Sequence, residues 1–297
     1  VYKLSALVRG MEALTEKYNN LMKLGDPRTR DWFLMASPIP SALICLLYVL
    51  AIIVGMRAMQ NRQAMGLRYP MIVYNFCMVA LSGYLVFEFL ASGWLAGYSL
   101  SCQPVDYSNS PQATRMARAC YLFYFSKFIE LADTVFFVLR KKFNQVSFLH
   151  VFHHAIMPAS WWFGVYFVPG GFGTFHAMLN SFIHFLMYMY YGLAAAGYTV
   201  WWKRYMTKMQ IGQFLLVTVH SCQLFFIPCN YPIVFAWWIL SYAVIFLILF
   251  ANFYVKAYAA GRRLQQQQQK QNGHQNGAHS KERLAHAVSN GNGKKAE

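Results

Sequence analysis

The chain has 297 residues, of which 57% are hydrophobic, 18% are aromatic and only 12% are charged, with a formal net charge of +16. A water-soluble domain of this size cannot bury so much apolar surface, so the composition is typical of a polytopic membrane protein. The basic residues lie between apolar runs and in the C-terminal tail, with no Arg-rich stripe, which argues against a nucleic-acid partner.

Seven apolar runs have about the length of roughly 20 residues that a helix needs to cross a bilayer. Residues 1–36 precede them as an N-terminal segment, and residues 37–260 are predicted to form a seven-helix transmembrane domain. The sequence therefore predicts an all-α integral membrane protein. The expected spans are 39–57, 70–94, 118–139, 147–168, 172–194, 206–227 and 232–255.

Basic residues occupy alternate loops between these runs. Loops rich in Lys and Arg stay in the cytosol. We therefore predict that these loops and the C-terminal tail are cytosolic and that residues 1–36 are lumenal. The three basic loops carry Arg57, Arg62 and Arg68, then Arg140, Lys141 and Lys142, then Lys203, Arg204 and Lys208.

Six cysteines are scattered without a CxxC pair or a metal-binding spacing. Cys102 and Cys229 fall on the predicted lumenal side, and an oxidising compartment there would permit a disulfide between them. This pairing is a hypothesis at this point. The other four lie inside apolar runs and are predicted to be core residues: Cys45, Cys77, Cys120 and Cys222.

The tail, residues 261–297, is rich in Gln, Asn, Gly and Lys and is predicted to be disordered. Its three histidines, His274, His279 and His286, are therefore discounted as ligands. Lys294 and Lys295 stand fourth and third from the last residue. On a cytosolic tail this is the pattern of a dilysine retrieval signal, so we predict a multi-pass protein of the endoplasmic reticulum membrane.

Ionisable residues inside a membrane span are functional by default. The third run contains "KFIELADT", in which helical periodicity places Lys127, Glu130 and Thr134 on one side, with Asp133 beside Glu130. The alternative is a buried ion cluster that only fixes helix packing.

The next three runs carry the remaining polar groups. "HVFHH" places three histidines at i, i+3 and i+4 on one helical stripe. Under the predicted topology these groups lie at mid-span or nearer the cytosolic end of their helices, so we expect one chamber that opens to the cytosol. His220 is predicted to be structural. The residues that face this chamber are His150, His153 and His154, then His176, Asn180, His184, Tyr188 and Tyr191, then Gln210 and Gln213.

The histidines could hold a metal or react themselves. A di-iron centre held mainly by imidazole needs about eight ligands, whereas the spans contain six histidines and one HxxHH box. Imidazoles that a low-dielectric site keeps neutral can act as nucleophiles or general bases. We favour this second chemistry and assign no metal ligands. A histidine-box di-iron desaturase or hydroxylase stays open as the alternative.

Two other classes share a seven-span topology. A G-protein-coupled receptor is disfavoured because the third span ends in "FFVLRKK" rather than Asp-Arg-Tyr and the seventh lacks Asn-Pro-x-x-Tyr. A transporter with a histidine proton relay remains open, and consumption of acyl-CoA would distinguish an enzyme from it.

Four motifs occur together in one order: "KFIELADT", "LRKKFNQVSFLHVFHH", "NSFIHFLMYMYYG" and "TKMQIGQF". In this order and approximate spacing, the chain from about residue 33 to 260 resembles the very-long-chain fatty acid elongases, the membrane 3-ketoacyl-CoA synthases. The resemblance implies an acyltransferase that condenses a long or very long chain acyl-CoA with malonyl-CoA. The product is a 3-oxoacyl-CoA two carbons longer, and CO2 and coenzyme A are released.

The resemblance also implies a fold and partners. Six of the seven helices would form an inverted barrel around an acyl-chain tunnel, with no bound cofactor. Chain-length preference would depend on how the tunnel closes at its lumenal side. A reductase and a dehydratase would act on the product, and a homodimer is left open.

By resemblance, His153 would be the nucleophile of an acyl-histidine intermediate, His150 and His154 its base or orienting partners, and His184 an aid to condensation. Asn180, His184 and Lys127 are donors that suit a developing enolate, and Asp133 would orient an imidazole. The expected substrate-binding residues are Glu130, Thr134, Tyr188, Tyr191, Gln210 and Gln213 in the chamber, and Arg140, Lys141, Lys142, Lys203, Arg204 and Lys208 for the phosphates of coenzyme A.

Overall fold

The computed structural model describes residues 2–257, with side chains from residue 9 onward. The predicted disordered tail from residue 261, its three histidines and the dilysine pair Lys294 and Lys295 lie outside the described residues. By its contacts the chain divides into two units, Val1–Leu247 and Ile248–Glu297. Of the second unit, only the end of the last helix, residues 248–257, is described.

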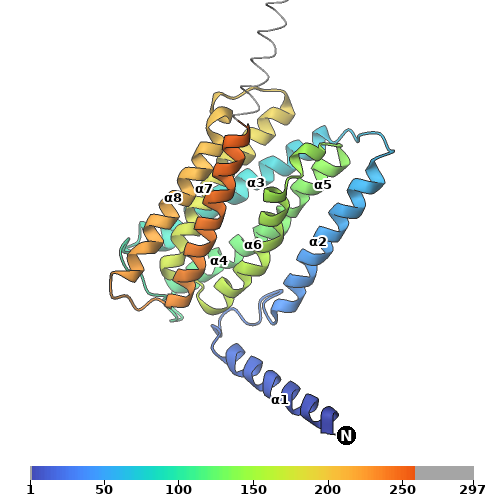
Figure 1. Cartoon of the computed structure of the whole chain (residues 1–297). Helices are drawn as coiled ribbons and strands as arrows, with labels where there is room; N and C mark the ends of the chain where they lie inside the picture. The colour runs from blue at the N-terminus through green and yellow to red at the C-terminus, as the bar shows by residue number, and fades with distance from the viewer. Residues whose placement is uncertain (1, 258–297) are drawn as a thin grey trace, which may run out of the picture. The chain divides into compact units, whose positions relative to one another are not determined.

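The described residues form helices and connecting turns without a strand, which confirms the predicted all-α class (Figure 1). Short irregular turns join the helices, and one of them, η1 (Leu90–Trp94), extends α3. The helices are α1 (Tyr2–Lys23), α2 (Pro38–Met59), α3 (Arg68–Phe89), α4 (Pro111–Ile129), α5 (Leu131–Leu139), α6 (Phe148–Phe167), α7 (Thr174–Ala196), α8 (Met206–Cys222) and a last helix, Ile233–Ala257.

Three helices are long and apolar enough to cross a bilayer by themselves: Pro38–Met59, Arg68–Trp94 and Ile233–Ala257. The chain is therefore a multi-pass membrane protein. The third predicted run, 118–139, is not one helix, because the structure breaks it at Glu130 into α4 and α5. Glu130 keeps a helical backbone, with φ −62° and ψ −19°. Hydropathy detects the length of an apolar run but not such a one-residue break.

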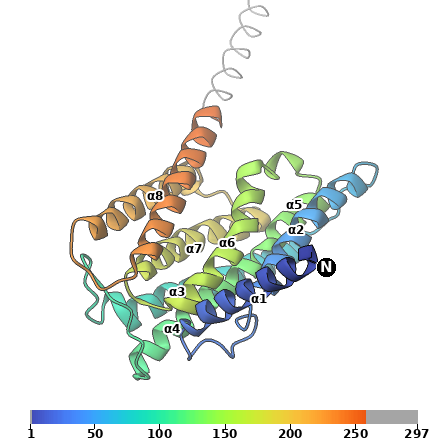
Figure 2. The same ribbon diagram turned by 60° about the horizontal axis from the view of Figure 1, so that its bottom comes forward.

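Several helices pack against helices that do not follow them directly in the chain. α3 lies along α7 in both views (Figures 1 and 2), and α6 contacts both α2 and α4. α3 also contacts α4, and α7 contacts α8. The last helix reaches α6 through Trp238, whose Nε1 donates to Ser160 Oγ at 2.9 Å. It reaches α8 through the rings of Phe246 and Phe214, whose centroids are 5.6 Å apart.

The basic loops of the sequence meet at one end of the helices, here called the basic end. Lys141 Nζ donates to the carbonyl oxygens of Gln60 and Arg62, at 2.8 and 2.9 Å. Arg68 donates to the carbonyl oxygens of Ala195 and Ala196, at the end of α7. These two side chains thus connect the first basic loop to the second and to the end of α7.

The other loops meet at the opposite end of the helices. Arg28 donates to the carbonyl oxygens of Asp106 and Ser108, at 2.9 and 2.5 Å. The backbone N–H of Phe172 donates to the carbonyl oxygen of Gln103 at 2.8 Å. From α2 onward the helices therefore run in alternate directions between the two ends, with α4 and α5 following each other in one direction.

The N-terminal segment forms α1, whose side chains from Arg9 to Leu21 are exposed. Its connection to α2 is tied to α6 at the opposite end. Tyr166 OH donates to the carbonyl oxygen of Met22 at 3.0 Å, and Trp162 Nε1 donates to that of Leu34 at 3.0 Å.

Serine caps set where three of the helices begin. A serine before the first turn satisfies a backbone N–H that would otherwise lack a partner. Ser37 and Ser110 do so for α2 and α4, each followed by a proline in the first turn. Ser147 Oγ accepts from the backbone N–H of His150 at 3.2 Å. This cap places His150 in the first turn of α6, at the basic end.

The cysteines inside the apolar runs differ in burial. Cys45 and Cys120 are buried, as predicted, and Cys222 is half-buried. The prediction is wrong for Cys77, which is exposed on α3. A helix surrounded by lipid can be apolar on every side, so composition alone does not identify its buried face.

Candidate active site

A buried ion pair joins α4 to α7. Lys127 Nζ donates to Glu130 Oε1 at 2.7 Å and to Asn180 Oδ1 at 3.0 Å. It also lies 4.3 Å from the centre of the Phe123 ring. His184 Nδ1 lies 3.2 Å from the same Glu130 oxygen. The helix break at Glu130 thus carries a carboxylate that faces both a lysine and a histidine.

Thr134 on α5 connects the first span to the histidine stripe. Its Oγ1 lies 2.7 Å from Tyr48 OH and 2.8 Å from His150 Nε2, both within hydrogen-bond distance. Sequence reasoning missed Tyr48, because a tyrosine in an apolar run is common in membrane helices. The threonine fixes the orientation of the His150 ring.

The expectation that Asp133 orients an imidazole is corrected by the structure. Asp133 Oδ2 accepts a hydrogen bond from Tyr188 OH at 2.6 Å. Spacing within one helix cannot show which side chain of a neighbouring helix reaches a carboxylate. The groups that face the imidazoles are instead Thr134, at His150, and Glu130, at His184.

The three histidines of α6 lie together but in different surroundings. The ring centroids of His150 and His154 are 4.4 Å apart, and those of His153 and His154 are 5.2 Å apart. His153 lies 5.1 Å from the ring of Phe246 and lines a small cavity. His150 is thus hydrogen-bonded to Thr134, whereas His153 lines a cavity.

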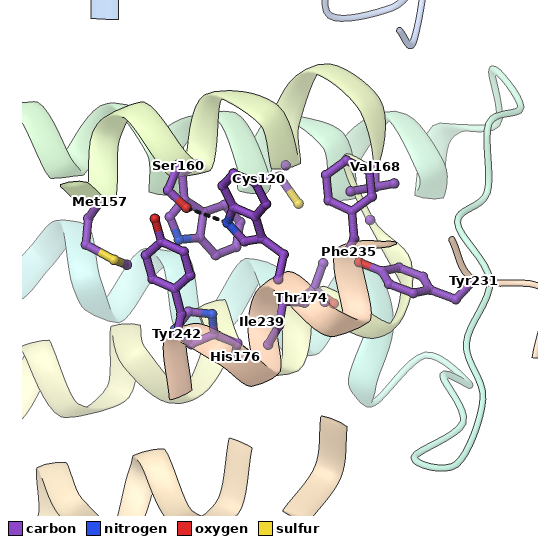
Figure 3. Close-up of a pocket in the computed structure, with 15 residues that line it drawn as sticks. Cys120, Met157, Ser160, Val168, Thr174, His176, Tyr231, Phe235, Ile239 and Tyr242 are labelled. Carbon is purple, nitrogen blue, oxygen red and sulfur yellow. Dashed lines mark hydrogen bonds between the residues drawn. The ribbon is translucent and has the colours of Figure 1, made fainter. Parts of the chain in front are cut away.

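A second, larger cavity adjoins the one at His153. Both are bordered by Met157, His176 and Tyr242. The larger one lies between α4, α6, α7 and the last helix, with walls that are mostly aromatic and aliphatic (Figure 3). The two adjoining cavities, with His153 beside the smaller one, are called the passage below.

Buried polar atoms without a hydrogen-bond partner surround the start of this passage. Among the described residues these atoms include Glu130 Oε2 and Gln213 Nε2. A buried polar atom left unpaired costs about 1–3 kcal/mol, and such groups often mark sites that bind a ligand. The unpaired atoms of Glu130 and Gln213 are available to a ligand.

The other expected chamber residues have partners within the protein. Gln210 Nε2 lies 3.9 Å from Met187 Sδ. The ring of Tyr191 contacts those of Tyr188 and Tyr190. Across residues 2–257, no group of three or more His, Cys, Asp or Glu side chains could hold a metal ion.

The six basic residues expected to bind phosphates lie in the loops and helix ends of the basic end. Lys142, Lys203, Arg204 and Lys208 are exposed. Arg140 contacts Met71 Sδ. The cations of the last loop lie over tyrosine rings: Lys203 over Tyr190, and Arg204 and Lys208 over Tyr205. None of these side chains is among those that line the two cavities.

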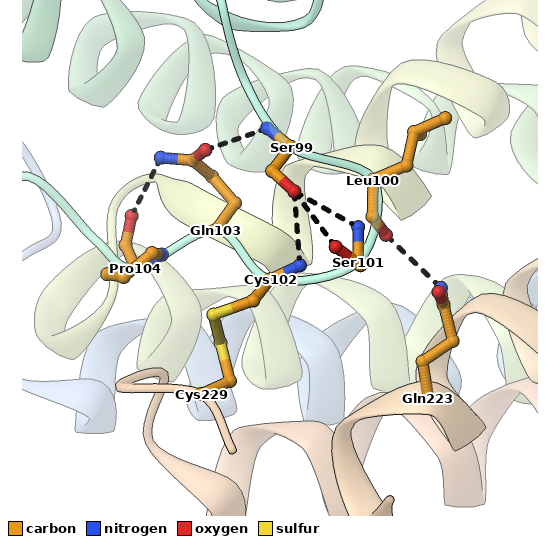
Figure 4. The surroundings of a disulfide bond; sticks show 8 residues. All are labelled: Ser99, Leu100, Ser101, Cys102, Gln103, Pro104, Gln223 and Cys229. Atoms are coloured by element: carbon orange, nitrogen blue, oxygen red, sulfur yellow. Dashed lines mark hydrogen bonds between the residues drawn. A yellow bond between two sulfur atoms is a disulfide. The ribbon is translucent and has the colours of Figure 1, made fainter. Parts of the chain in front are cut away.

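Cys102 and Cys229 form a disulfide at the opposite end, the pairing that the sequence analysis put forward (Figure 4). Beside it, Gln223 Nε2 donates to the carbonyl oxygen of Leu100 at 3.2 Å. His220 stacks against Phe172 and Phe175, at 3.9 and 4.1 Å between ring centroids. This packing fits the structural role expected of His220.

Residues 33–267 match a protein-family model described as ELO: GNS1/SUR4 family. The chain is 54% identical over 254 residues to very long chain fatty acid elongase 7 of Rattus norvegicus, covering 83% of this chain and 90% of that protein. It is 52% identical over 263 residues to very long chain fatty acid elongase 1 of Homo sapiens, covering 86% and 94%. It is 50% identical over 277 residues to very long chain fatty acid elongase 7 of Drosophila melanogaster, covering 90% and 84%. The matched region contains the histidine stripe, the buried ion pair and both cavities, and the chain belongs to the ELO (GNS1/SUR4) family.

Proposed function

We propose that this protein is a very-long-chain fatty acid elongase, an acyltransferase that condenses an acyl-CoA with malonyl-CoA to a 3-oxoacyl-CoA two carbons longer. Relatives that are 50–54% identical over most of the chain carry the name of this activity. The structural observation that carries the proposal is the position of His153, which lines a small cavity that adjoins a larger, mostly apolar one.

In the first step a ring nitrogen of His153 attacks the thioester carbonyl carbon of the acyl-CoA. The carbon–sulfur bond breaks, and the proton lost by the imidazole passes through His154 to the departing thiolate. Coenzyme A leaves as the thiol, and the acyl group remains on His153. The 5.2 Å between the ring centroids of His153 and His154 supports this route for the proton.

In the second step malonyl-CoA loses CO2, and the electron pair of the broken carbon–carbon bond stays on the carbon next to its thioester. This carbanion attacks the acyl carbonyl carbon, the carbon–nitrogen bond to His153 breaks, and the imidazole regains a proton from solvent. Donors placed in advance stabilise the enolate charge. Two residues supply these donors: Asn180, which accepts a hydrogen bond from the Lys127 ammonium, and His184.

The fold assigned to this function has seven spans, with α4 and α5 as one bent span. Six of them enclose the passage as an inverted barrel. The neighbour pairs α6 with α4, α4 with α3, α3 with α7 and α7 with α8 support this arrangement, as do the contacts of the last helix with α8 and α6. α2 then lies outside, against α5 and α6.

The orientation follows from charge and redox chemistry. The basic end is cytosolic, and the end with the disulfide is lumenal, because a stable disulfide needs an oxidising compartment. The protein then lies in the endoplasmic reticulum membrane. The phosphates of coenzyme A meet the basic loops, and a reductase and a dehydratase remove the keto group of the product.

The test is mass spectrometry of the intact purified protein after incubation with acyl-CoA alone. The wild type should gain the mass of one acyl group, and His153→Ala should not. His150→Gln, which keeps a hydrogen-bonding side chain near Thr134, is the matched control and should still gain the acyl group.

Formation of 3-oxoacyl-CoA by His153→Ala at the wild-type rate would remove His153 as the nucleophile. Product formation by the wild type without any adduct would favour direct condensation, with the histidines as bases and donors. Failure of the wild type to make 3-oxoacyl-CoA from both substrates would overturn the proposed activity.

A further inference from the structure

The passage reaches from His153 to Tyr231, and we call its part beside Tyr231 the far end. Its larger cavity extends along α6 from Met157 to Val168, at the end where the disulfide lies. Figure 3 shows Met157 and Tyr242 at one end of this cavity and Tyr231 at the other. Tyr231 belongs to the short loop between α8 and the last helix.

Several contacts hold Tyr231 in this position. Its side chain is 5% exposed and belongs to a buried cluster with Val168, Phe172 and Leu224. Its hydroxyl lies so close to Gly173 that a methyl group at that glycine would be only 2.6 Å from the oxygen. A side chain at residue 173 would therefore force the phenol to shift.

The disulfide fixes the loop that carries Tyr231. Cys229 lies two residues before Tyr231 and is bonded to Cys102 (Figure 4). The loop that contains Cys102 is in turn hydrogen-bonded to the turn before α7, from Phe172 N–H to the carbonyl oxygen of Gln103. The loops of Cys102 and Cys229, the turn before α7 and the ring of Tyr231 are therefore linked to one another at the far end of the passage.

We infer that Tyr231 closes the acyl-chain passage and sets the longest acyl chain that the enzyme accepts. The inference rests on the proposed function, and it adds the residue that measures the substrate. Closure of the passage explains why Tyr231 lies in a loop that a disulfide fixes and beside a residue without a side chain.

The length of the passage fits very long chains. Fifteen residues of α6 and its C-cap separate His153 from Val168, which is about 22 Å at 1.5 Å per residue. The hydrocarbon core of a bilayer is about 30 Å thick, so one leaflet is roughly 15 Å. A chain attached at His153 and ending at Tyr231 is therefore longer than one that spans a single leaflet.

The experiment supplies the purified full-length protein with malonyl-CoA and a series of saturated acyl-CoAs of increasing length, and the 3-oxoacyl-CoA products are identified by mass spectrometry. Tyr231→Ala opens the far end, so the longest accepted chain should increase by at least two carbons. Tyr231→Phe keeps the ring and is the matched control, so its longest product should equal that of the wild type.

A second variant changes Gly173, the residue that contacts the Tyr231 hydroxyl, and so tests the position of the ring. Gly173→Ala pushes the phenol into the cavity, so the longest accepted chain should shorten by at least two carbons. Opposite shifts in the two variants cannot come from general instability, which would lower activity for every chain length alike.

The inference is overturned if the wild type elongates acyl-CoA but Tyr231→Ala, at wild-type thermal stability, accepts the same longest chain. It is also overturned if Tyr231→Phe shifts the product length as much as Tyr231→Ala does. A wild type that makes no 3-oxoacyl-CoA would instead overturn the proposed function on which this inference rests.

Discussion

Lys127 and Glu130 are the most costly residues of the molecule to bury. Each side chain is 2% exposed, and an isolated charge in such a place would be strongly destabilising. The pair is tolerated because the ammonium has Glu130 and Asn180 as partners. Such a cluster can serve helix packing or the reaction, and measurements of stability and activity separate the two roles.

Breaking the pair on one side should separate them. Lys127→Met leaves a buried carboxylate without its cation and should lower the free energy of unfolding by about 3–5 kcal/mol. The double variant Lys127→Met/Glu130→Gln removes both charges and should regain most of that loss. Neither variant should form 3-oxoacyl-CoA, because the donor to the enolate is missing.

Thermal unfolding in one detergent and the rate of product formation are the two measurements. A single variant as stable as the wild type would contradict the buried pair. Activity that returns with stability in the double variant would assign the pair to helix packing alone.

At the scale of elements, the molecule is held differently at its two ends. The basic end is joined by single side chains, such as Lys141, that donate to carbonyl oxygens of a neighbouring loop. The opposite end has a covalent cross-link between loops 127 residues apart in sequence. A link that closes a long loop restricts the unfolded chain strongly. The far end of the passage is therefore the better fixed of the two.

Removal of this cross-link should weaken the protein measurably. Cys229→Ser should lower the free energy of unfolding by about 2–4 kcal/mol and reduce the thermal midpoint. Cys77→Ser, at an exposed and unpaired cysteine of α3, is the control and should leave the midpoint unchanged. A reducing agent should bring the wild type down to the midpoint of Cys229→Ser. Equal midpoints for all three proteins would show that the disulfide adds no stability.

At the scale of the whole molecule, the alternation of loops between two ends determines what each side of the membrane meets. Arg140, Lys141 and Lys142 lie at the end where α6 begins, and the disulfide lies at the end where α6 finishes. The proposed orientation puts His153 nearer the cytosol, where charged coenzyme A substrates are found. It puts the closed end of the passage toward the lumen.

Labelling of single cysteines should establish this orientation. Asn144→Cys lies in an exposed loop position at the basic end, and Ser108→Cys in one at the opposite end. Each substitution is introduced into a background variant in which Cys77 and Cys222 are replaced by Ser. In sealed microsomes a membrane-impermeant maleimide should label Asn144→Cys, and should label Ser108→Cys only after permeabilisation. The reverse pattern would overturn the orientation.

The sequence alone determined the class of the protein, most helix positions and the histidine stripe. These features depend on hydropathy, helical periodicity and serine caps, which are local along the chain. The spacing of "HVFHH" was enough to place three imidazoles on one face of α6. Motif order was enough to identify the family, which the match of residues 33–267 confirms.

The tertiary structure decided which side chains meet. Nothing in the residue pattern indicated that Thr134 bridges Tyr48 and His150, or that Asp133 bonds Tyr188. It could not show that Tyr231 fills the space beside Gly173. Such contacts join residues on different helices, and their geometry depends on how those helices pack rather than on spacing along one of them. The chemistry of the site can therefore be predicted from residue types, whereas the orientation of each group and the closed end of the passage required the packed structure.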